Sequence, residues 1–248
     1  MESSLNKIKS LSFVEQLLHF EVLDSTNTYA RELAALPASG LTLICADTQR
    51  AGRGRGDNTF FSNINGGLYA SLVCFVQDLT AHFTYNRAIS LAICDAIQNR
   101  FEFSPLFIKW PNDIYWQDRK LGGILLETIA GRQNHIVIGL GINVNLRGDD
   151  FPHDLRNIAT SIFAETGVKI DIHELLYDIL TLFWSYCVLP GADAHALYTQ
   201  RLYRPGASVE INGHKGLFAG VKEDGRLCLN KGADAETEYV MSGTLKYL

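Results

Sequence analysis

Arginine and glycine alternate in one polar segment of this chain, Gln49-Arg50-Ala51-Gly52-Arg53-Gly54-Arg55-Gly56, which follows an apolar run at residues 41–46. Glycine lets backbone N–H groups come close to a ligand, and the arginine guanidinium offers planar donors that fit a carboxylate or a phosphate. The segment therefore predicts a loop that binds an anion. It matches neither the GxxxxGK(S/T) phosphate loop nor a GxGxxG helix start, and a solvated basic turn is the alternative for the segment taken alone.

A second polar group is Lys109-Trp110-Pro111-Asn112-Asp113, which follows a short apolar run at residues 106–108. Proline and an Asn-Asp pair favour a turn, so a cation, an amide and a carboxylate are expected together on one turn. The alternative is an ordinary turn in which Asp113 caps the local backbone and Lys109 is solvated.

Two further segments carry glycines inside apolar runs. Gly122 and Gly123 stand at the entry of the run at residues 124–129, and residues 139–145 contain two more glycines followed by the amide of Asn143. Glycine weakens a strand, so its presence indicates that some group must approach the backbone closely. A β-bulge is the competing explanation.

Hydrophobic periodicity supplies the elements that position these groups. Apolar residues recur every three or four positions over residues 85–97 and 172–186, which predicts two amphipathic helices. Asp171 is expected to cap the second helix, with Glu174 completing a capping box. A third helix is expected after Ser25-Thr26-Asn27.

Short apolar runs predict the strands of a main domain, residues 1–203, at 41–46, 68–76, 106–108, 124–129 and 135–140. Turn-like pieces separate the last three, which favours consecutive antiparallel hairpins. The predicted class is α+β, a mixed, mainly antiparallel sheet with helices on one face. Residues 204–248 predict a small β-barrel, with strands at 207–211, 216–221, 226–230 and 238–241.

Composition excludes several classes of protein. With 248 residues, 47% of them hydrophobic, the chain can bury a core, and a net charge of -5 argues against a surface that coats nucleic acid. Five widely spaced cysteines without a CxxC or Cys/His cluster predict reduced thiols, no zinc site and the cytoplasm. No signal-peptide pattern or long apolar run predicts a membrane association.

The polar segments occur in an order that resembles the biotin protein ligases of the BirA type. The family motifs STN, QxAGRGR, KWPND, KLGGILLE and GLGINVN correspond here to residues 25–27, 49–55, 109–113, 120–127 and 139–145. The resemblance covers nearly everything after residue 19, and the strand-rich tail is similar to the family's SH3-like domain. It implies the class II synthetase-like fold of the biotin/lipoate ligases.

The resemblance implies a two-step ligase. Biotin and ATP, accompanied by Mg²⁺, would give biotinyl-5′-AMP and pyrophosphate, and a lysine of a biotin carboxyl carrier protein or domain would then accept the biotinyl group. The reaction joins two anions, so fixed cations and N–H donors are needed. The resemblance does not give the oligomeric state, and a homodimer is one possibility.

The resemblance also implies roles for residues. Lys109 would contact the biotin carboxylate and the α-phosphate, Asn143 the adenylate, Phe60 the adenine ring, and Asp113 the incoming lysine. Small polar side chains would bind the ureido ring of biotin, namely Ser25, Thr26, Asn27 and Gln49. The loop that closes over the intermediate would contain Gly52, Arg53, Gly54 and the catalytic Arg55. Backbone at Gly122 and Gly123 would line the pocket.

The loop departs from the family pattern RGRxGxxW. Gly56 follows Arg55 directly, Asp57 brings a negative charge toward the expected phosphates, and Phe60 replaces the usual tryptophan. Phenylalanine can stack on adenine but lacks the indole N–H. These departures mark the nucleotide side of the loop as the place where this chain differs from its relatives.

Two other functions compete with this one. A lipoate or octanoate protein ligase would share the fold, but the GRGR and KWPND segments favour biotin over the RRxxGGG loop of lipoate ligases. A non-enzymatic biotin- or nucleotide-binding module is disfavoured by Lys109. About 20 residues precede the catalytic domain, too few for a DNA-binding winged helix, so DNA is not an expected partner.

Overall fold

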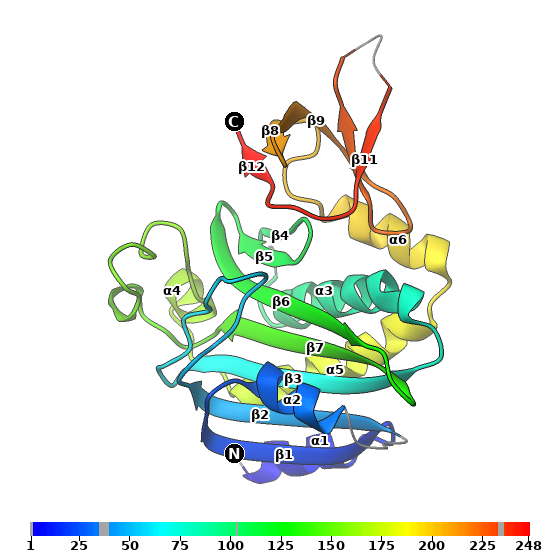
Figure 1. The fold of residues 1–248 in the computed structure, drawn as a ribbon. Helices are drawn as coiled ribbons and strands as arrows, with labels where there is room; N and C mark the ends of the chain where they lie inside the picture. The colour runs from blue at the N-terminus through cyan, green and yellow to red at the C-terminus, as the bar shows by residue number, and fades with distance from the viewer. Residues whose placement is uncertain (1, 35–39, 103, 233–235) are drawn as a thin grey trace.

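Two β-sheets organise the part of the chain that the structure describes (Figure 1). The computed structural model describes residues 2–34, 40–102, 104–232 and 236–248. The larger sheet has the strand order β1-β2-β3-β7-β6-β5-β4, and the smaller sheet has the order β11-β10-β9-β8-β12. Figure 1 shows the smaller sheet above the edge of the larger sheet that carries β5 and β4.

The strands of the larger sheet are β1 (Val14–Leu23), β2 (Leu41–Gln49), β3 (Gly67–Val76), β4 (Leu106–Lys109), β5 (Asp113–Trp116), β6 (Arg119–Ile129) and β7 (Asn134–Asn143). Those of the smaller sheet are β8 (Ser208–Ile211), β9 (His214–Val221), β10 (Leu227–Asn230), β11 (Glu238–Val240) and β12 (Lys246–Tyr247). The helices are α1 (Glu2–Lys9), α2 (Thr26–Leu33), α3 (His82–Gln98), α4 (Ile162–Thr166), α5 (Ile172–Val188) and α6 (Gly191–Gln200). Two short 3-10 helices are η1 (Leu79–Ala81) and η2 (Gly148–Asp150).

The larger sheet is mixed, as the sequence predicts. β1 pairs in parallel with β2, and the remaining neighbours pair antiparallel. The central strands β3 and β7 are buried on both faces, which explains why they read as almost continuous apolar runs. The predicted antiparallel pairing of residues 124–129 with 135–140 is confirmed by the β6–β7 ladder.

The helices cover both faces of the larger sheet, so the prediction of helices on one face is wrong for α2. Alternate residues of β2 and β3 pack against α3 and α5 in one core cluster. The intervening residues Ile44 and Val73 pack against Ala30 of α2 in a second cluster. Periodicity identifies the apolar stripe of a helix but not which face of a sheet the helix covers.

Several helices and strands were not predicted from the sequence, because their hydrophobic patterns are weak. The edge strand β1 mixes apolar residues with Glu15, His19 and Glu21. The strand β5 is four residues long and begins at Asp113, which the sequence pattern assigns to a turn. The helix α1 and the two-residue strand β12 were also missed.

The start of α5 is fixed by the predicted cap. Asp171 Oδ1 accepts hydrogen bonds from the amides of His173 and Glu174, at 2.8 and 3.2 Å. The predicted capping-box role of Glu174 is wrong, because its carboxylate binds Lys7 Nζ of α1 at 2.7 Å. The second oxygen of Asp171 accepts the hydroxyl of Ser4 at 2.9 Å, so one side chain caps α5 and holds α1 against it.

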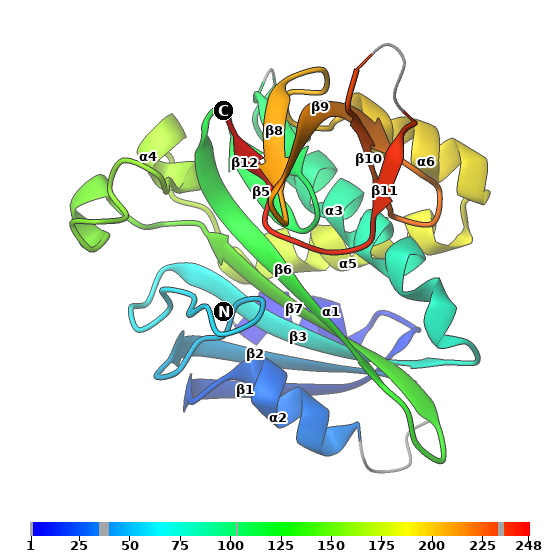
Figure 2. The same cartoon turned by 45° about the horizontal axis from the view of Figure 1, so that its top comes forward.

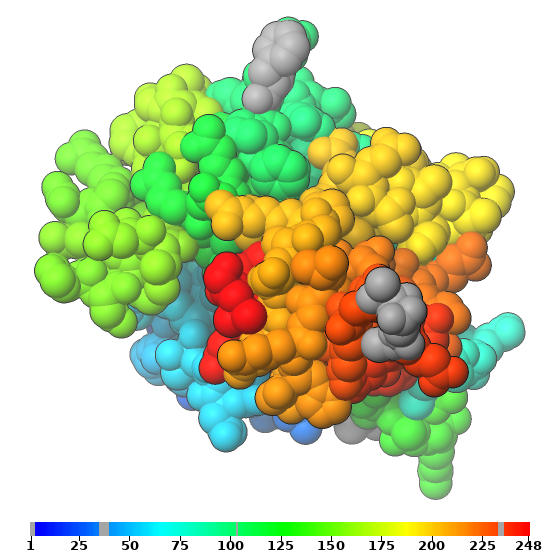
Figure 3. All heavy atoms as spheres, turned by 90° about the horizontal axis from the view of Figure 1, so that it is seen from above, coloured from blue at the N-terminus to red at the C-terminus, as the bar shows by residue number. Residues whose placement is uncertain are grey.

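The smaller sheet supports the predicted C-terminal barrel, and its strands occupy the predicted positions within a few residues. It lies against the rest of the chain through specific contacts. The indole Nε1 of Trp110 donates to the carbonyl of Gly225 at 2.9 Å, and Tyr247 OH donates to the carbonyl of Tyr203 at 2.7 Å. Seen from above, the barrel covers the centre of the molecule beside α6 (Figure 3). The predicted domain boundary after Tyr203 stays a prediction.

We expect Asp171→Ala to lower the free energy of unfolding by about 0.5–2 kcal/mol, because two amides at the start of α5 lose their acceptor. Asp171→Asn keeps a side-chain oxygen and is the matched control. Urea titrations of both variants and the parent protein measure the effect. Equal stabilities of the alanine and asparagine variants would contradict the capping role.

Candidate active site

A cavity of about 460 Å³ opens where the larger sheet, the arginine-glycine loop and the C-terminal barrel meet. Its walls come from the start of α2, the loop at residues 53–60, the turn at residues 109–113, the strands β6 and β7, and barrel residues near 212 and 243–245. Figure 2 shows the cyan loop and the green strands below the red end of the chain. The volume is in the range of small-molecule sites.

One end of the cavity consists of uncharged polar groups at the start of α2. Ser25 caps the helix by accepting from the amide of Thr28, and Gln49 Oε1 accepts from the amide and the hydroxyl of Thr26, at 2.8 and 3.2 Å. Ser71 donates to Asn27 Oδ1 at 2.7 Å. These side chains are buried, and their mutual hydrogen bonds fix their orientation.

Asn27 is held from a second direction by β6. Its Nδ2 lies 3.0 Å from Glu127 Oε2 and 3.3 Å from the carbonyl oxygen of Leu125. A Cβ atom at Gly139 of β7 would overlap Asn27 Oδ1, and one at Gly141 would lie 2.7 Å from the ring of Phe60. The close approach that the glycines indicated in the sequence is therefore found at both positions of β7.

The arginine-glycine loop folds back on itself. Gly54 N donates to the carbonyl of Asn58 at 2.7 Å, and Phe60 N donates to the carbonyl of Gly52 at 2.9 Å. Gly56 at the tip has a φ of 60°, a conformation that glycine adopts without strain. A Cβ atom at Gly52 would overlap Ser62 Oγ, so this glycine is required by packing at the base of the loop.

The two central arginines of the loop bind different parts of the protein. Arg53 makes a bidentate ion pair with Glu127 of β6, with both N–O distances 3.1 Å. Arg31 of α2 lies 3.6 Å from the same carboxylate. Arg55 instead donates to the carbonyl of Gly243 in the barrel at 3.2 Å. A carbonyl carries no net charge, so the positive charge of Arg55 stays available to an anion in the cavity.

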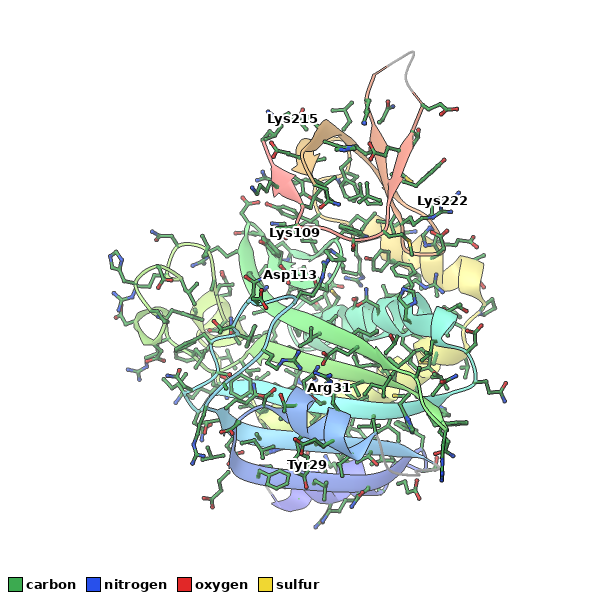
Figure 4. The ribbon with its side chains drawn as sticks, viewed as in Figure 1. Tyr29, Arg31, Lys109, Asp113, Lys215 and Lys222 are labelled. Carbon is green, nitrogen blue, oxygen red and sulfur yellow. The ribbon has the colours of Figure 1, made fainter. Side chains whose placement is uncertain are left out.

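Lys109 stands at the end of β4, opposite Asp113 of β5. Its Nζ donates to Tyr115 OH at 3.1 Å and lies 5.0 Å from the ring centroid of Tyr115 and 5.5 Å from that of Tyr247. Burial lowers the pKa of Lys109 below the usual lysine value, and the negative charge of Asp113 opposes part of this shift. Asp113 itself pairs with Lys120 Nζ at 2.7 Å. Figure 4 shows Lys109 and Asp113 close together beneath the barrel.

Most of the residues predicted for the site line this one cavity. They are Ser25, Thr26, Asn27, Gln49, Arg53, Gly54, Arg55, Phe60, Lys109, Asp113 and Gly123. Gly52, Gly122 and Asn143 lie outside its lining. The amide of Asn143 donates to the carbonyl of Thr160 at 2.9 Å, and a Cβ atom at Gly122 would lie 2.5 Å from the carbonyl of Gly141. Asn143 and Gly122 therefore lie behind the cavity wall and support it.

The wall that the barrel contributes to the cavity was not predicted from the sequence. Asn212, Gly243, Thr244 and Leu245 line the cavity although they belong to the C-terminal segment. They carry no motif with a charged or nucleophilic group, and they follow Lys109 by more than 100 positions. The hydrogen bond from Arg55 to Gly243 is the contact that brings the loop to them.

The arrangement separates two chemistries within one cavity. The start of α2 offers neutral donors and acceptors, which suit a neutral polar ring. Lys109 and Arg55 bring positive charge to the side beneath the barrel, which suits carboxylate or phosphate oxygens. A ligand with a polar head and an anionic tail fits such a site.

A family model for the biotin/lipoate A/B protein ligases matches residues 19–143, about half of the chain. The chain belongs to the biotin/lipoate A/B protein ligase family. The match includes the start of α2, the arginine-glycine loop, the turn at residues 109–113 and both glycine-bearing strands. It therefore contains the sheet side of the cavity and leaves out the barrel.

Individual relatives agree with this family. The biotin–acetyl-CoA-carboxylase ligase of Paracoccus denitrificans is 30% identical over 230 residues, which cover 83% of this chain and 90% of that protein. The bifunctional ligase/repressor BirA of Bacillus subtilis is 38% identical over 173 residues, which cover 68% of this chain and 53% of that protein. The chain thus spans about half the length of the BirA relatives it matches.

A solved structure extends the likeness to the barrel. The biotin protein ligase from Aquifex aeolicus in complex with biotin and ATP aligns with a TM-score of 0.79 at 24% identity, covering 94% of this chain and 99% of that one. This likeness shows that the fold is that of the biotin protein ligases. The predicted α+β class is confirmed, and the second sheet is consistent with the predicted SH3-like barrel.

We expect Gly139→Ala to displace Asn27 from its hydrogen bonds and to lower the free energy of unfolding by about 1–3 kcal/mol. Gly148→Ala is the matched control, because nothing lies within 4 Å of its added methyl group. Urea denaturation of both variants tests the prediction. If both variants are as stable as the parent, the close packing at Gly139 does not constrain Asn27.

Proposed function

We propose that this protein is an ATP-dependent biotin protein ligase. It would form biotinyl-5′-AMP from biotin and ATP and transfer the biotinyl group to a lysine of a biotin carboxyl carrier protein or domain. The observation that carries the proposal is the joint presence, in one cavity, of a neutral polar end at α2 and a cationic side at Lys109 and Arg55. The family membership and the biotin ligase names of the relatives support it.

The neutral end suits the ureido ring of biotin. This ring has N–H donors and a carbonyl acceptor but no charge, so it is matched by hydroxyl and amide groups. Ser25, Thr26, Asn27 and Gln49 supply such groups, and they are oriented by hydrogen bonds to one another and to β6. A site whose polar groups are fixed before binding discriminates strongly against ligands that leave them unpaired.

The cationic side suits the adenylation step. A carboxylate oxygen of biotin attacks the α-phosphorus of ATP, a P–O bond forms, and the bond to pyrophosphate breaks. Two anions must meet, and at about 4 Å with an effective dielectric of about 20 each fixed cation contributes about 4 kcal/mol of attraction before desolvation. We assign this role to Lys109 and Arg55, whose charges are not neutralised by their hydrogen-bond partners, because Tyr115 OH and the carbonyl of Gly243 are uncharged groups.

The transfer step needs a neutral amine at the acyl carbon. The amine of the acceptor lysine attacks, AMP leaves with the electron pair, and the amine proton passes to solvent or to a carboxylate. We assign Asp113 to orienting the incoming lysine, because it faces the cavity and is held in place by Lys120. The loop at Arg53 and Gly54 shields the mixed anhydride from water.

Magnesium would enter with ATP. The cavity carboxylate Asp113 is already paired with Lys120 at 2.7 Å, so the protein side of the site is poor in free carboxylate ligands. Mg²⁺ is usually held by phosphate oxygens and water with few protein ligands. The ion would offset phosphate charge, while Lys109 and Arg55 act from the protein side.

The setting of the reaction follows from the proposed acceptor. We place the proposed reaction in the cytoplasm. The five free cysteines agree with a reducing compartment of this kind. Within the described residues, no helix combines the length and the apolar character needed to cross a membrane. Homodimer formation stays a prediction that gel filtration or light scattering can decide.

Biotin-dependent exchange of pyrophosphate into ATP tests the proposed substrate. We expect exchange with biotin and little exchange with octanoate or lipoate, because the polar end at α2 would leave its donors and acceptors unpaired against an alkyl chain. Exchange supported by octanoate or lipoate but not by biotin would assign the protein to the other branch of its family. Binding of biotin without exchange would favour a non-enzymatic module.

Lys109→Ala should lower the exchange rate on the order of 100-fold, because one charge-stabilising group is lost. Lys215→Ala is the control, since Lys215 lies on the outer side of the barrel (Figure 4).

Burial lowers the pKa of Lys109, so its charge is lost as pH rises through a value below the ordinary lysine pKa of about 10.4. We therefore expect kcat/KM for exchange to fall on the alkaline side, and Lys109→Arg to move that fall to higher pH. The same alkaline limb in both proteins would remove Lys109 as its source.

A further inference from the structure

Three potential metal ligands meet on the face of the larger sheet that α5 covers. His19 lies on β1, Asp47 on β2 and His173 in the first turn of α5. One donor atom of each side chain lies within 4.8 Å of those of the other two. His19 Nε2 and Asp47 Oδ1 are 2.8 Å apart, and the two imidazole rings lie edge to face with centroids 5.5 Å apart.

The surroundings of this group are those of a site rather than of an open surface. The three side chains are partly buried, with exposed fractions of 22%, 23% and 12% for His19, Asp47 and His173. Asp47 and His173 line a second cavity of about 230 Å³, which is separate in its lining from the active-site cavity. Asn65 and Asn145 line it together with apolar residues, so polar groups for a water molecule lie on part of its wall.

We propose that His19, Asp47 and His173 form a binding site for Zn²⁺ or a similar transition-metal ion. Two imidazoles and one carboxylate are a donor set that such ions prefer, whereas Mg²⁺ and Ca²⁺ prefer oxygen donors. In a tetrahedral site with bonds of about 2.0–2.1 Å, donor atoms lie about 3.3 Å apart. The present separations, 2.8 Å for one pair and within 4.8 Å for the set, bracket that value, so binding would require side-chain adjustments of about 1 Å.

The fourth coordination position would face the second cavity and hold water. Asp171 is the other carboxylate close by, with its Oδ1 3.9 Å from His173 Nδ1. Its oxygens already accept the amides of His173 and Glu174 and the hydroxyl of Ser4. Asp171 therefore stays the cap of α5 and adds negative charge beside the proposed cation.

The three ligands lie far apart along the chain, which is why no zinc site is predicted from the sequence. The three residues are 28 and 126 positions apart along the chain, so they form no compact motif, and β1 was not recognised as a strand. A bound ion would tie the edge strand β1 to β2 and α5. Asp47 precedes Gln49 by two residues on β2, so the ion would also fix the strand that supports the polar end of the active-site cavity.

The competing explanation is a His19–Asp47 hydrogen bond beside an unrelated histidine. Metal titration separates the two. Untagged, chelator-treated protein is titrated calorimetrically with ZnCl₂ in the absence of biotin and ATP, and with CoCl₂ by visible absorption. We expect one equivalent of tight Zn²⁺ binding, a visible Co²⁺ spectrum of low-symmetry coordination, and a higher melting temperature with Zn²⁺.

Three variants test the ligands, each with its fold checked by circular dichroism. His19→Gln, His173→Gln and Asp47→Asn should each weaken Zn²⁺ binding by at least about 10- to 100-fold, since even outer-shell partners cost that much. His214→Gln is the matched control, because His214 is exposed on the barrel beside Glu238 and Lys231. The proposal is overturned by the absence of stoichiometric binding, by binding that survives the three ligand changes, or by binding that His214→Gln removes. The titration needs no substrate, so its outcome is independent of the proposed ligase activity.

Discussion

The bare backbone of β7 at Gly139 and Gly141 is the constraint on which the cavity depends. Because no side chain occupies these positions, Asn27 of α2 and Phe60 of the loop lie directly against the strand. Glu127 of the neighbouring strand then binds both Asn27 and Arg53. The helix, the loop and the sheet are thus held in one arrangement by a single unobstructed stretch of strand and one carboxylate.

The residues of this arrangement could be predicted from the sequence, but most of the residues that they contact could not. The family resemblance places Lys109, Asn27 and Arg55 in one site, and all three line the cavity. Glycine in a strand has a local physical meaning, so the close approach to β7 could be anticipated. Arg53 shows the limit, because an arginine-rich loop indicates anion binding, but only the fold reveals that its anion is Glu127, 74 positions away.

Long-range geometry accounts for what the sequence could not show. The edge strand β1 has a polar side and lacks a clear alternation, and β5 consists of four residues, one of which also suits a turn. The choice of sheet face for α2 depends on which apolar residues of β2 and β3 remain uncovered by α3 and α5. Such information exists only after the other elements have packed.

The barrel's share of the cavity has a consequence for the order of assembly. Residues 243–245 line the site, and Arg55 reaches the carbonyl of Gly243. These residues are made after all the other lining residues, so the cavity lacks one wall until they have packed against the sheet. In the proposed reaction the adenylate must be kept from water, so the site is complete only once the contact between Arg55 and the barrel has formed.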